Sequence, residues 1–168
     1  MTISMYQASV PVFTRNFKNL IAILKKAEAF AAERKIDQAV IVNYRLAPDM
    51  FPLARQVQIA TDVAKGCMAR LAGQEPPSWK DEEASIPELI ARLQKCVDYA
   101  SGFEPAQLDG TEDKTVTLKM RDGERTFKGL PYLLEFVLPN VYFHVTTAYA
   151  ILRHCGVSIG KDDFLGPQ

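Results

Sequence analysis

The sequence contains only two histidines, three cysteines and one tryptophan, and it has no long uninterrupted apolar run. A membrane-spanning helix needs about 20 predominantly apolar residues, and no segment here reaches about 18 without interruption. Residues 1–7 lack a basic region followed by an apolar stretch, which argues against a secretory signal peptide. The sequence therefore predicts a soluble, unprocessed protein with no membrane partner.

The cysteines do not form a disulfide pattern. Cys67, Cys96 and Cys155 are odd in number, lie far apart, and each falls inside a predicted helix. Short secreted folds held by disulfides instead carry an even number of closely spaced cysteines. We expect reduced thiols that pack as small apolar side chains, and hence a cytoplasmic protein.

An excess of charge is also missing, because 20 basic and 20 acidic residues give a net charge of +0. The basic residues are interspersed and form no cluster that would bind phosphates, which argues against nucleic acid as a partner. The chain has 168 residues, of which 48% are hydrophobic. A chain of this length can bury roughly 68–70% of its unfolded surface, so we expect one domain over residues 1–168.

Four segments carry apolar residues at three- and four-residue spacing, which is typical of amphipathic helices. They cover residues 4–34, 52–71 and 87–101, and a fourth stretch that begins at Tyr132 or Pro139 and ends at His154. Pro11 lies inside the first pattern and lacks the amide donor that the preceding turn needs, so it should bend the helix or mark its true start, and we expect a bend. Ser85 followed by Glu88 indicates the beginning of the third helix.

Residues 115–127 break the helical pattern. Val116, Leu118 and Met120 alternate with polar residues, and an aspartate–glycine turn follows at Asp122-Gly123. This predicts a β-hairpin inserted between the third and fourth helices, which should lean on the helical body because two short strands are marginal alone. The tail after Gly156 has turn character, and we expect it to fold back over the helices.

His144 is the most informative residue, because it lies within the apolar stripe of the fourth helix. At about 100° per residue it shares a face with Val141, Ala148 and Ile151, so the helix carries an imidazole into the core. A neutral imidazole there can bind a metal, move a proton, or donate one hydrogen bond and accept another. The second histidine, His154, lies at the helix end, where a positive imidazole interacts favourably with the helix dipole.

Other polar residues are candidates to accompany His144. Gln56 lies at the edge of the apolar stripe of the second helix and is the better inward candidate, whereas Asp62 projects about 180° away and should be solvated or paired at the surface. Asn140, one turn before His144, could orient the imidazole, contact a ligand or cap the helix. Tyr149 has a polar tip that could line a pocket, although such rings more often pack against their neighbours.

Two sequence patterns found in enzymes, a pair of acidic residues and a glycine-containing phosphate loop, are not supported by their context in this chain. The acidic pairs Glu82-Glu83 and Asp162-Asp163 lie in polar stretches and look solvated, so a two-carboxylate hydrolase has no inward candidates. Residues 156–162 superficially suggest a phosphate loop, but three residues rather than four separate the glycines, and Asp162 stands where Ser or Thr belongs.

Four stretches carry a resemblance that spans nearly the whole chain. Residues 46–53 read LAPDMFPL, residues 70–73 read RLAG, residues 138–153 read LPNVYFHVTTAYAILR and residues 160–166 read GKDDFLG. They resemble an uncharacterised bacterial family, domain of unknown function 1993. That family is similar to the DinB/YfiT group, which implies an all-α, up-down-down-up four-helix bundle with a long crossover, often forming a homodimer.

The resemblance also implies where a metal would lie. In the wider DinB-like group, nickel or zinc is typically held by three histidines, one from the second helix and an HxxxH pair from the fourth, and some relatives act on thiol cofactors. His144 matches the first histidine of the pair, Ala148 takes the second place, and Gln56 or a neighbour takes the place on the second helix. Because the chain has only two histidines, the resemblance implies a degraded metal site around His144.

Three interpretations of function remain. The first is a small-molecule-binding or noncatalytic domain with a cavity lined by His144, Asn140, Gln56 and Tyr149. The second is a divalent-metal-dependent enzyme, thiol-transferase-like or hydrolase-like, with a rearranged site in which His144 is a metal ligand or general base. The third is a purely structural bundle that forms dimers.

Overall fold

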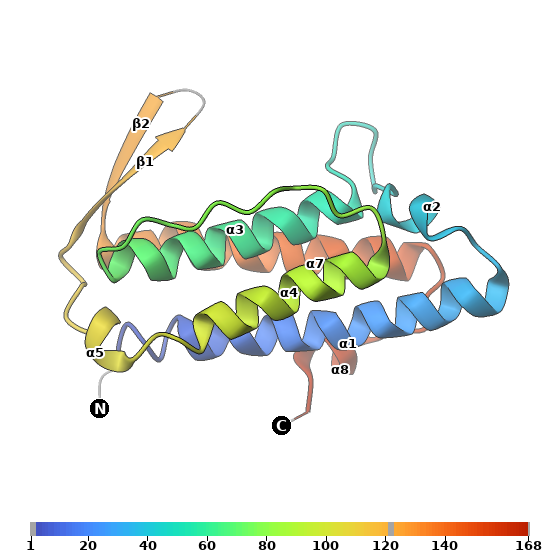
Figure 1. Cartoon of the computed structure of the whole chain (residues 1–168), viewed down its shortest axis with the longest axis horizontal. Helices are drawn as coiled ribbons and strands as arrows, with labels where there is room; N and C mark the ends of the chain where they lie inside the picture. Colours follow the sequence, from blue (N-terminus) through green and yellow to red (C-terminus); the bar gives the residue numbers. More distant parts are fainter. Residues whose placement is uncertain (1–2, 121–122, 168) are drawn as a thin grey trace.

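The computed structural model describes residues 3–120 and 123–167, which form four long helices joined by shorter elements (Figure 1). The long helices are α1 (Val10–Arg34), α3 (Leu53–Leu71), α4 (Ile86–Ala100) and α7 (Leu138–His154). The shorter elements are α2 (Gln38–Val42), α5 (Pro105–Leu108), β1 (Thr115–Met120), β2 (Gly123–Lys128), α6 (Gly129–Pro131), the π-helical segment η1 (Tyr132–Val137) and α8 (Lys161–Leu165).

Each long helix packs against two others. Helices α1 and α3 both contact α4 and α7, and the apolar core lies between these four helices. Figure 1 shows α1 and α7 running in one direction and α3 and α4 in the other. Residues 72–85, which we call the crossover segment, run along the helices to join α3 to α4. Among the described residues, no helix combines the length and apolarity that a bilayer span requires.

Helix α1 begins later than the apolar pattern predicts. It starts at Val10, so Pro11 lies in the first turn and does not bend the helix. Proline is tolerated there because the first amides of a helix have no partner within it. Residues 5–9 form turns instead, and the Ser9 hydroxyl donates to the Met5 carbonyl at 2.6 Å. The predicted start at residue 4 and the expected bend at Pro11 were therefore wrong, and the alternative that Pro11 marks the true start is confirmed.

The second and third helices agree with their predicted bounds to within one residue. Gly73 follows α3 with a φ of +77°, a conformation that glycine adopts without strain. At the start of α4, the Ser85 hydroxyl accepts from the Glu88 amide, and the Glu88 carboxylate accepts from the Ser85 amide. The predicted cap is therefore present, and it fixes where the crossover segment ends.

The helix that carries His144 is preceded by η1 without a break. A proline inside a helix clashes with the carbonyl four residues earlier, which for Pro139 is the carbonyl of Glu135. Glu135 lies within η1, whose π-helical turns are wider than α-helical ones. The Asn140 Nδ2 donates to the Phe136 carbonyl at 2.6 Å and so provides a hydrogen-bond partner for one backbone carbonyl of η1. The two predicted starts of the fourth helix thus correspond to the beginnings of η1 and α7.

The predicted hairpin is present and rests on the helical body. Strands β1 and β2 are antiparallel, with Val116 opposite Phe127. The Phe127 ring lies 5.9 Å from that of Tyr132 and 5.3 Å from that of Phe136, measured between centroids. These contacts attach the hairpin to η1. Asp122, which we predicted in the turn, lies outside the described residues.

The tail folds back over the bundle, as predicted. Arg15 Nη2 donates to the Leu165 carbonyl at 3.1 Å, and Asn19 Nδ2 donates to the Phe164 carbonyl at 3.0 Å. Asp163 accepts from Lys26 of α1 and from the Gly160 amide. Helix α8 is therefore held against α1 by side chains that reach its backbone.

Candidate functional site

His144 of α7 and Gln56 of α3 meet between their two helices. His144 Nδ1 lies 2.7 Å from Gln56 Oε1, and the two residues are 8% and 1% exposed. Gln56 Nε2 donates to the Phe51 carbonyl at 2.9 Å. Because a carbonyl can only accept, the amide NH2 group must face Phe51 and the amide oxygen must face the imidazole.

This hydrogen bond sets the state of the imidazole. Nδ1 is protonated and donates a hydrogen bond to Gln56 Oε1, so Nε2 of the neutral ring keeps its lone pair. Within residues 3–120 and 123–167, no hydrogen bond reaches Nε2. Burial, with a smaller contribution from the Arg55 guanidinium, lowers the pKa of His144 to about 4, so the ring is neutral at neutral pH. A neutral ring with an unused Nε2 can accept a hydrogen bond or bind a metal.

One exposed aromatic ring adjoins the imidazole, and a second exposed aromatic residue contacts Gln56 through its backbone carbonyl. The Phe143 ring is edge-on to the His144 ring at 5.2 Å between centroids, and Phe143 is 57% exposed. Phe51, whose carbonyl holds Gln56, is 55% exposed, and the Arg55 guanidinium lies 6.0 Å from its ring centroid. The surroundings of the imidazole therefore offer apolar surface and one positive charge.

Within the residues that the structure describes, the other two predicted site residues form no hydrogen bond with the imidazole. The Asn140 amide is bonded to its own helix at Phe136, so Gln56 and not Asn140 orients the imidazole. The Tyr149 ring packs edge-on against Phe164 of α8 at 5.8 Å. Five residues separate Tyr149 from His144, which places them about 140° apart around α7. Of the four predicted residues, Gln56 and His144 are the two that the structure joins by a hydrogen bond, while Asn140 lies one turn before His144 on the same helix.

The donor set does not fit the nickel or zinc site that the family resemblance implies. Ala148, in the place of the second histidine of the pair, is fully buried and has no donor atom. The Gln56 oxygen is already used by the His144 Nδ1. In the part of the chain that the structure describes, no three His, Cys, Asp or Glu side chains are grouped so that they could hold a metal. Among the side chains that the structure describes around this position, His144 Nε2 is the one nitrogen left to bind a metal.

A buried arginine that sequence analysis missed joins α3, α4 and the crossover segment. Arg92 is 4% exposed, and its Nε donates to Thr61 Oγ1 at 2.9 Å. Its Nη2 lies 2.9 Å from carboxylate oxygens of Asp62 and Asp81, and its Nη1 lies 2.9 Å from Glu83. The available signal was its position, three residues after Leu89 and within the apolar stripe of the third helix.

The carboxylates around Arg92 correct one prediction and agree with another. Glu83 was predicted to be solvated, but its side chain is 15% exposed and accepts from Arg92 and from Gln58 Nε2. The prediction was wrong because both of its partners come from other elements. Asp62 was predicted to be solvated or paired at the surface, and it pairs with Lys65 and Arg92 while remaining 34% exposed.

The cysteines do not form a reactive centre. All three are free, Cys67 and Cys96 are buried, and Cys155 is half-buried. Burial raises the pKa of the Cys67 thiol above its usual range, raises that of Cys96 to about 12, and also raises that of Cys155. A nucleophilic thiol needs a lowered pKa and an accessible setting. Cys67 and Cys96 therefore act as small apolar core residues.

The chain matches a described protein family and is similar to a solved structure over most of its length. The family described as Domain of unknown function (DUF1993) matches residues 5–165. The chain is also similar to the crystal structure of a DinB family member protein from Shewanella denitrificans, with 43% sequence identity and a TM-score of 0.88. That similarity covers 97% of this chain and 92% of the other. No curated protein matches the sequence.

Proposed function

The chain belongs to the family described as Domain of unknown function (DUF1993), and we propose that it binds a small molecule at the Gln56–His144 pair. The observation that carries the proposal is the 2.7 Å hydrogen bond between these residues. It presents the His144 Nε2 as an acceptor of fixed orientation, which a hydrogen-bond donor on a ligand would complete. The ligand would thus take the place that a metal has in DinB-like proteins with three histidines.

The surroundings indicate the kind of ligand. Phe51 and Phe143 offer exposed aromatic surface, and Arg55 adds a positive charge. Arg55 is partly committed, because its Nη1 contacts Asp81 and Gln58. A small molecule with an apolar part and an N–H or O–H group directed at Nε2 fits these features.

The proposed role is noncatalytic. A general base works best when its pKa is near the operating pH, and His144, with a pKa of about 4, is a weak base at neutral pH. A metal-dependent reaction, thiol-transferase-like or hydrolase-like, would need further ligands that the residues around His144 do not supply. The enzyme interpretation therefore has less support than the binding interpretation.

Thermal-shift measurements across a metabolite panel test the proposal. We expect at least one compound to stabilise the protein, and His144→Ala to abolish that stabilisation while the bundle stays folded by circular dichroism. His154→Ala is the matched control, because His154 lies at the end of α7 beside Tyr44. Stabilisation that survives His144→Ala, or is lost equally in His154→Ala, would refute binding at this site.

We further propose that residues 1–168 form a single domain with the up-down-down-up topology of DinB-like bundles. The directions of the four long helices in Figure 1 and their pairwise packing support this topology. The even balance of charge supports a protein that does not bind nucleic acid, and the three free cysteines support a cytoplasmic location.

A homodimer is the remaining proposal from the family resemblance. Leu134, Tyr142 and Phe143, on η1 and α7, are 44%, 42% and 57% exposed, and a second copy would bury such apolar surface. Light scattering after gel filtration should give twice the chain mass, and Phe143→Asp should reduce it to one chain mass. A single chain mass for the unmodified protein would refute the dimer.

A further inference from the structure

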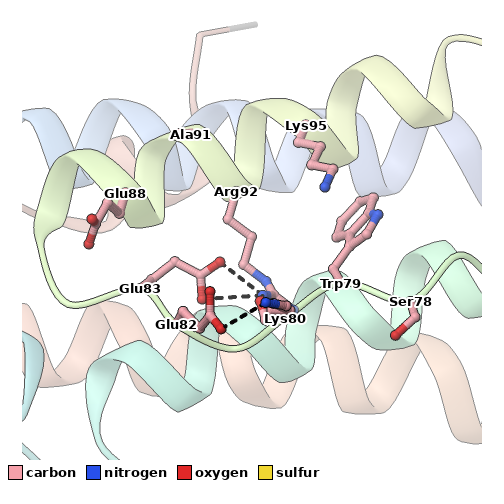
Figure 2. Close-up of a pocket in the computed structure, with 9 residues that line it drawn as sticks. All are labelled: Ser78, Trp79, Lys80, Glu82, Glu83, Glu88, Ala91, Arg92 and Lys95. Atoms are coloured by element: carbon pink, nitrogen blue, oxygen red, sulfur yellow. Dashed lines mark hydrogen bonds and ion pairs between the residues drawn. The ribbon is translucent and has the colours of Figure 1, made fainter.

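A cavity of about 540 Å³ lies between the crossover segment and the first turns of α4 (Figure 2). Residues 78–80, 82 and 83 form one wall, and α4 residues from Glu88 to Lys95 form the other. Small-molecule sites usually have volumes of roughly 300–1,000 Å³. None of the residues predicted to surround His144 lines this cavity, so it is a separate place from the Gln56–His144 pair.

The acidic groups of this cavity already have partners. Glu83 accepts from Arg92, and Glu82 lies 3.4 Å from Lys80 Nζ. The Glu88 carboxylate accepts from backbone amides at the start of α4. Figure 2 shows Arg92 reaching from α4 to the crossover segment. Its donors are occupied by the Lys80 carbonyl and by the carboxylates of Glu83 and Asp62. The cavity therefore has little spare capacity to bind a cation.

The uncommitted polar groups are donors. Lys95 is exposed, and within the described residues no carboxylate lies within 4 Å of its Nζ. Its ammonium instead lies 4.6 Å from the centroid of the Trp79 ring. The Trp79 indole N–H and the Ser78 hydroxyl also make no hydrogen bond with any residue that the structure describes. The Lys95 ammonium and the indole N–H favour an anion over a cation, since both can only donate hydrogen bonds.

Trp79 supplies an aromatic surface beside these donors. Lys65 also lies 4.6 Å from its ring centroid, but Lys65 is buried and paired with Asp62. Tyr99 packs edge-on against the indole at 6.2 Å. The ring thus packs against buried Lys65 and partly buried Tyr99, whereas Lys95 is an exposed, flexible chain that can move to pair with an anion on the ring.

We propose that this cavity is a second binding site, which takes a small aromatic carboxylate. The ligand ring would pack on Trp79, and its carboxylate would pair with the Lys95 ammonium. This inference does not rest on the function proposed for His144.

Because Trp79 is the one tryptophan of the chain, its fluorescence reports directly on the cavity. Titration with benzoate should change the indole emission saturably, whereas neutral benzamide and ring-free acetate should bind at least fivefold more weakly. Lys95→Gln should weaken benzoate binding about fivefold, the size expected for a partly exposed ion pair. Glu82→Gln, which removes an exposed charge on the wall opposite Lys95, should not weaken binding, and His144→Ala should leave it unchanged.

The inference would be overturned by an emission that does not respond saturably to benzoate, by an equal response to benzamide, or by an unchanged benzoate affinity in Lys95→Gln that stays folded by circular dichroism. Loss of benzoate binding in His144→Ala would also overturn it, because the ligand would then occupy the other site. The thermal-shift test of the Gln56–His144 site can fail without affecting these outcomes.

Discussion

Arg92 Nη1 of α4 lies 2.9 Å from Glu83 Oε1 and 3.2 Å from Glu83 Oε2 in the crossover segment. The same guanidinium contacts Asp62 of α3, so one buried side chain joins three parts of the chain. The crossover segment has no regular secondary structure between residues 74 and 84. Its position over α3 and α4 therefore depends on these charged contacts.

Replacing Arg92 with methionine should destabilise the protein strongly. The change leaves Glu83 and the carboxylates of Asp62 and Asp81 without their shared cation, and breaking a buried ion pair lowers the free energy of unfolding by about 3–5 kcal/mol. Urea unfolding measures this loss. The matched control is Lys26→Met, which removes a 53% exposed partner of Asp163 and should change stability by at most about 1 kcal/mol. Equal losses in the two variants would contradict this role of Arg92.

Local patterns were enough to predict most of the helical framework. Apolar periodicity located the four long helices, the Ser85 and Glu88 pair located a helix start, and alternation located the hairpin. The same patterns missed α2 and α5, because helices of 5 and 4 residues are too short to show a period. The start of α1 was placed too early because apolar spacing continues through turns that precede Pro11.

The candidate site was predicted only in part, for a related reason. The inward positions of Gln56 and His144 follow from their own helical stripes, so each could be recognised separately. Which polar group meets the imidazole depends on how α3 and α7 pack, and one sequence does not contain that distance. Asn140 was an equal candidate by spacing, but its amide bonds to the π-helical turn before Pro139. Arg92 was missed for the same reason, since its carboxylate partners lie on other elements.

The low pKa of His144 predicts a pH-dependent contribution to stability. Its folded pKa is about 4, below the ordinary value of 6.5, so between these values the unfolded chain binds more protons than the folded one. The neutral imidazole therefore contributes fully to stability above about pH 6.5, and this contribution is lost as the pH falls toward about 4. The stability of the protein relative to His144→Gln should fall over that window. In nuclear magnetic resonance spectra, the His144 imidazole signal is identified because it is absent from the spectrum of His144→Gln. Its pH titration should give a midpoint near 4, and a midpoint near 6.5 would contradict the burial argument.

Replacing Gln56 with glutamate should reverse this shift. A carboxylate in place of the amide lies next to Nδ1 and favours the charged imidazole, so the pKa of His144 should rise above that of the unchanged protein. Gln56→Leu serves as the control, because it removes the acceptor without adding charge. It should leave the Nδ1 proton unsatisfied and destabilise the fold by about 1–3 kcal/mol. Nuclear magnetic resonance titration measures the first effect and urea unfolding the second. A pKa that is unchanged in Gln56→Glu would show that the two side chains do not meet.

The cysteines should differ in their reaction with iodoacetamide. Cys67 and Cys96 are buried and their thiol pKa values are raised, so the folded protein should be alkylated at Cys155 alone, and slowly. Mass spectrometry of peptides after native and urea-denatured labelling separates the sites. All three should react in urea, and equal labelling of Cys67 in the folded protein would contradict the packing of α3.

Two added histidines near His144 should create a three-histidine metal site of the kind that the family resemblance implies. Gln56→His together with Ala148→His would place three imidazoles on α3 and α7, the number of protein ligands that zinc has in many catalytic sites. We expect the double variant to bind about one nickel or zinc ion per chain, whereas the unchanged protein, purified without a metal-affinity tag, should hold no stoichiometric metal. Elemental analysis and calorimetry measure both. Ala148 is fully buried, so the added ring will crowd the core, and circular dichroism must first show that the variant is folded.

The control adds His144→Ala to the same two changes and should lose the metal. A folded double variant that binds no metal would show that Gln56, His144 and position 148 do not converge. Stoichiometric metal in the unchanged protein would instead restore the metal-dependent interpretation.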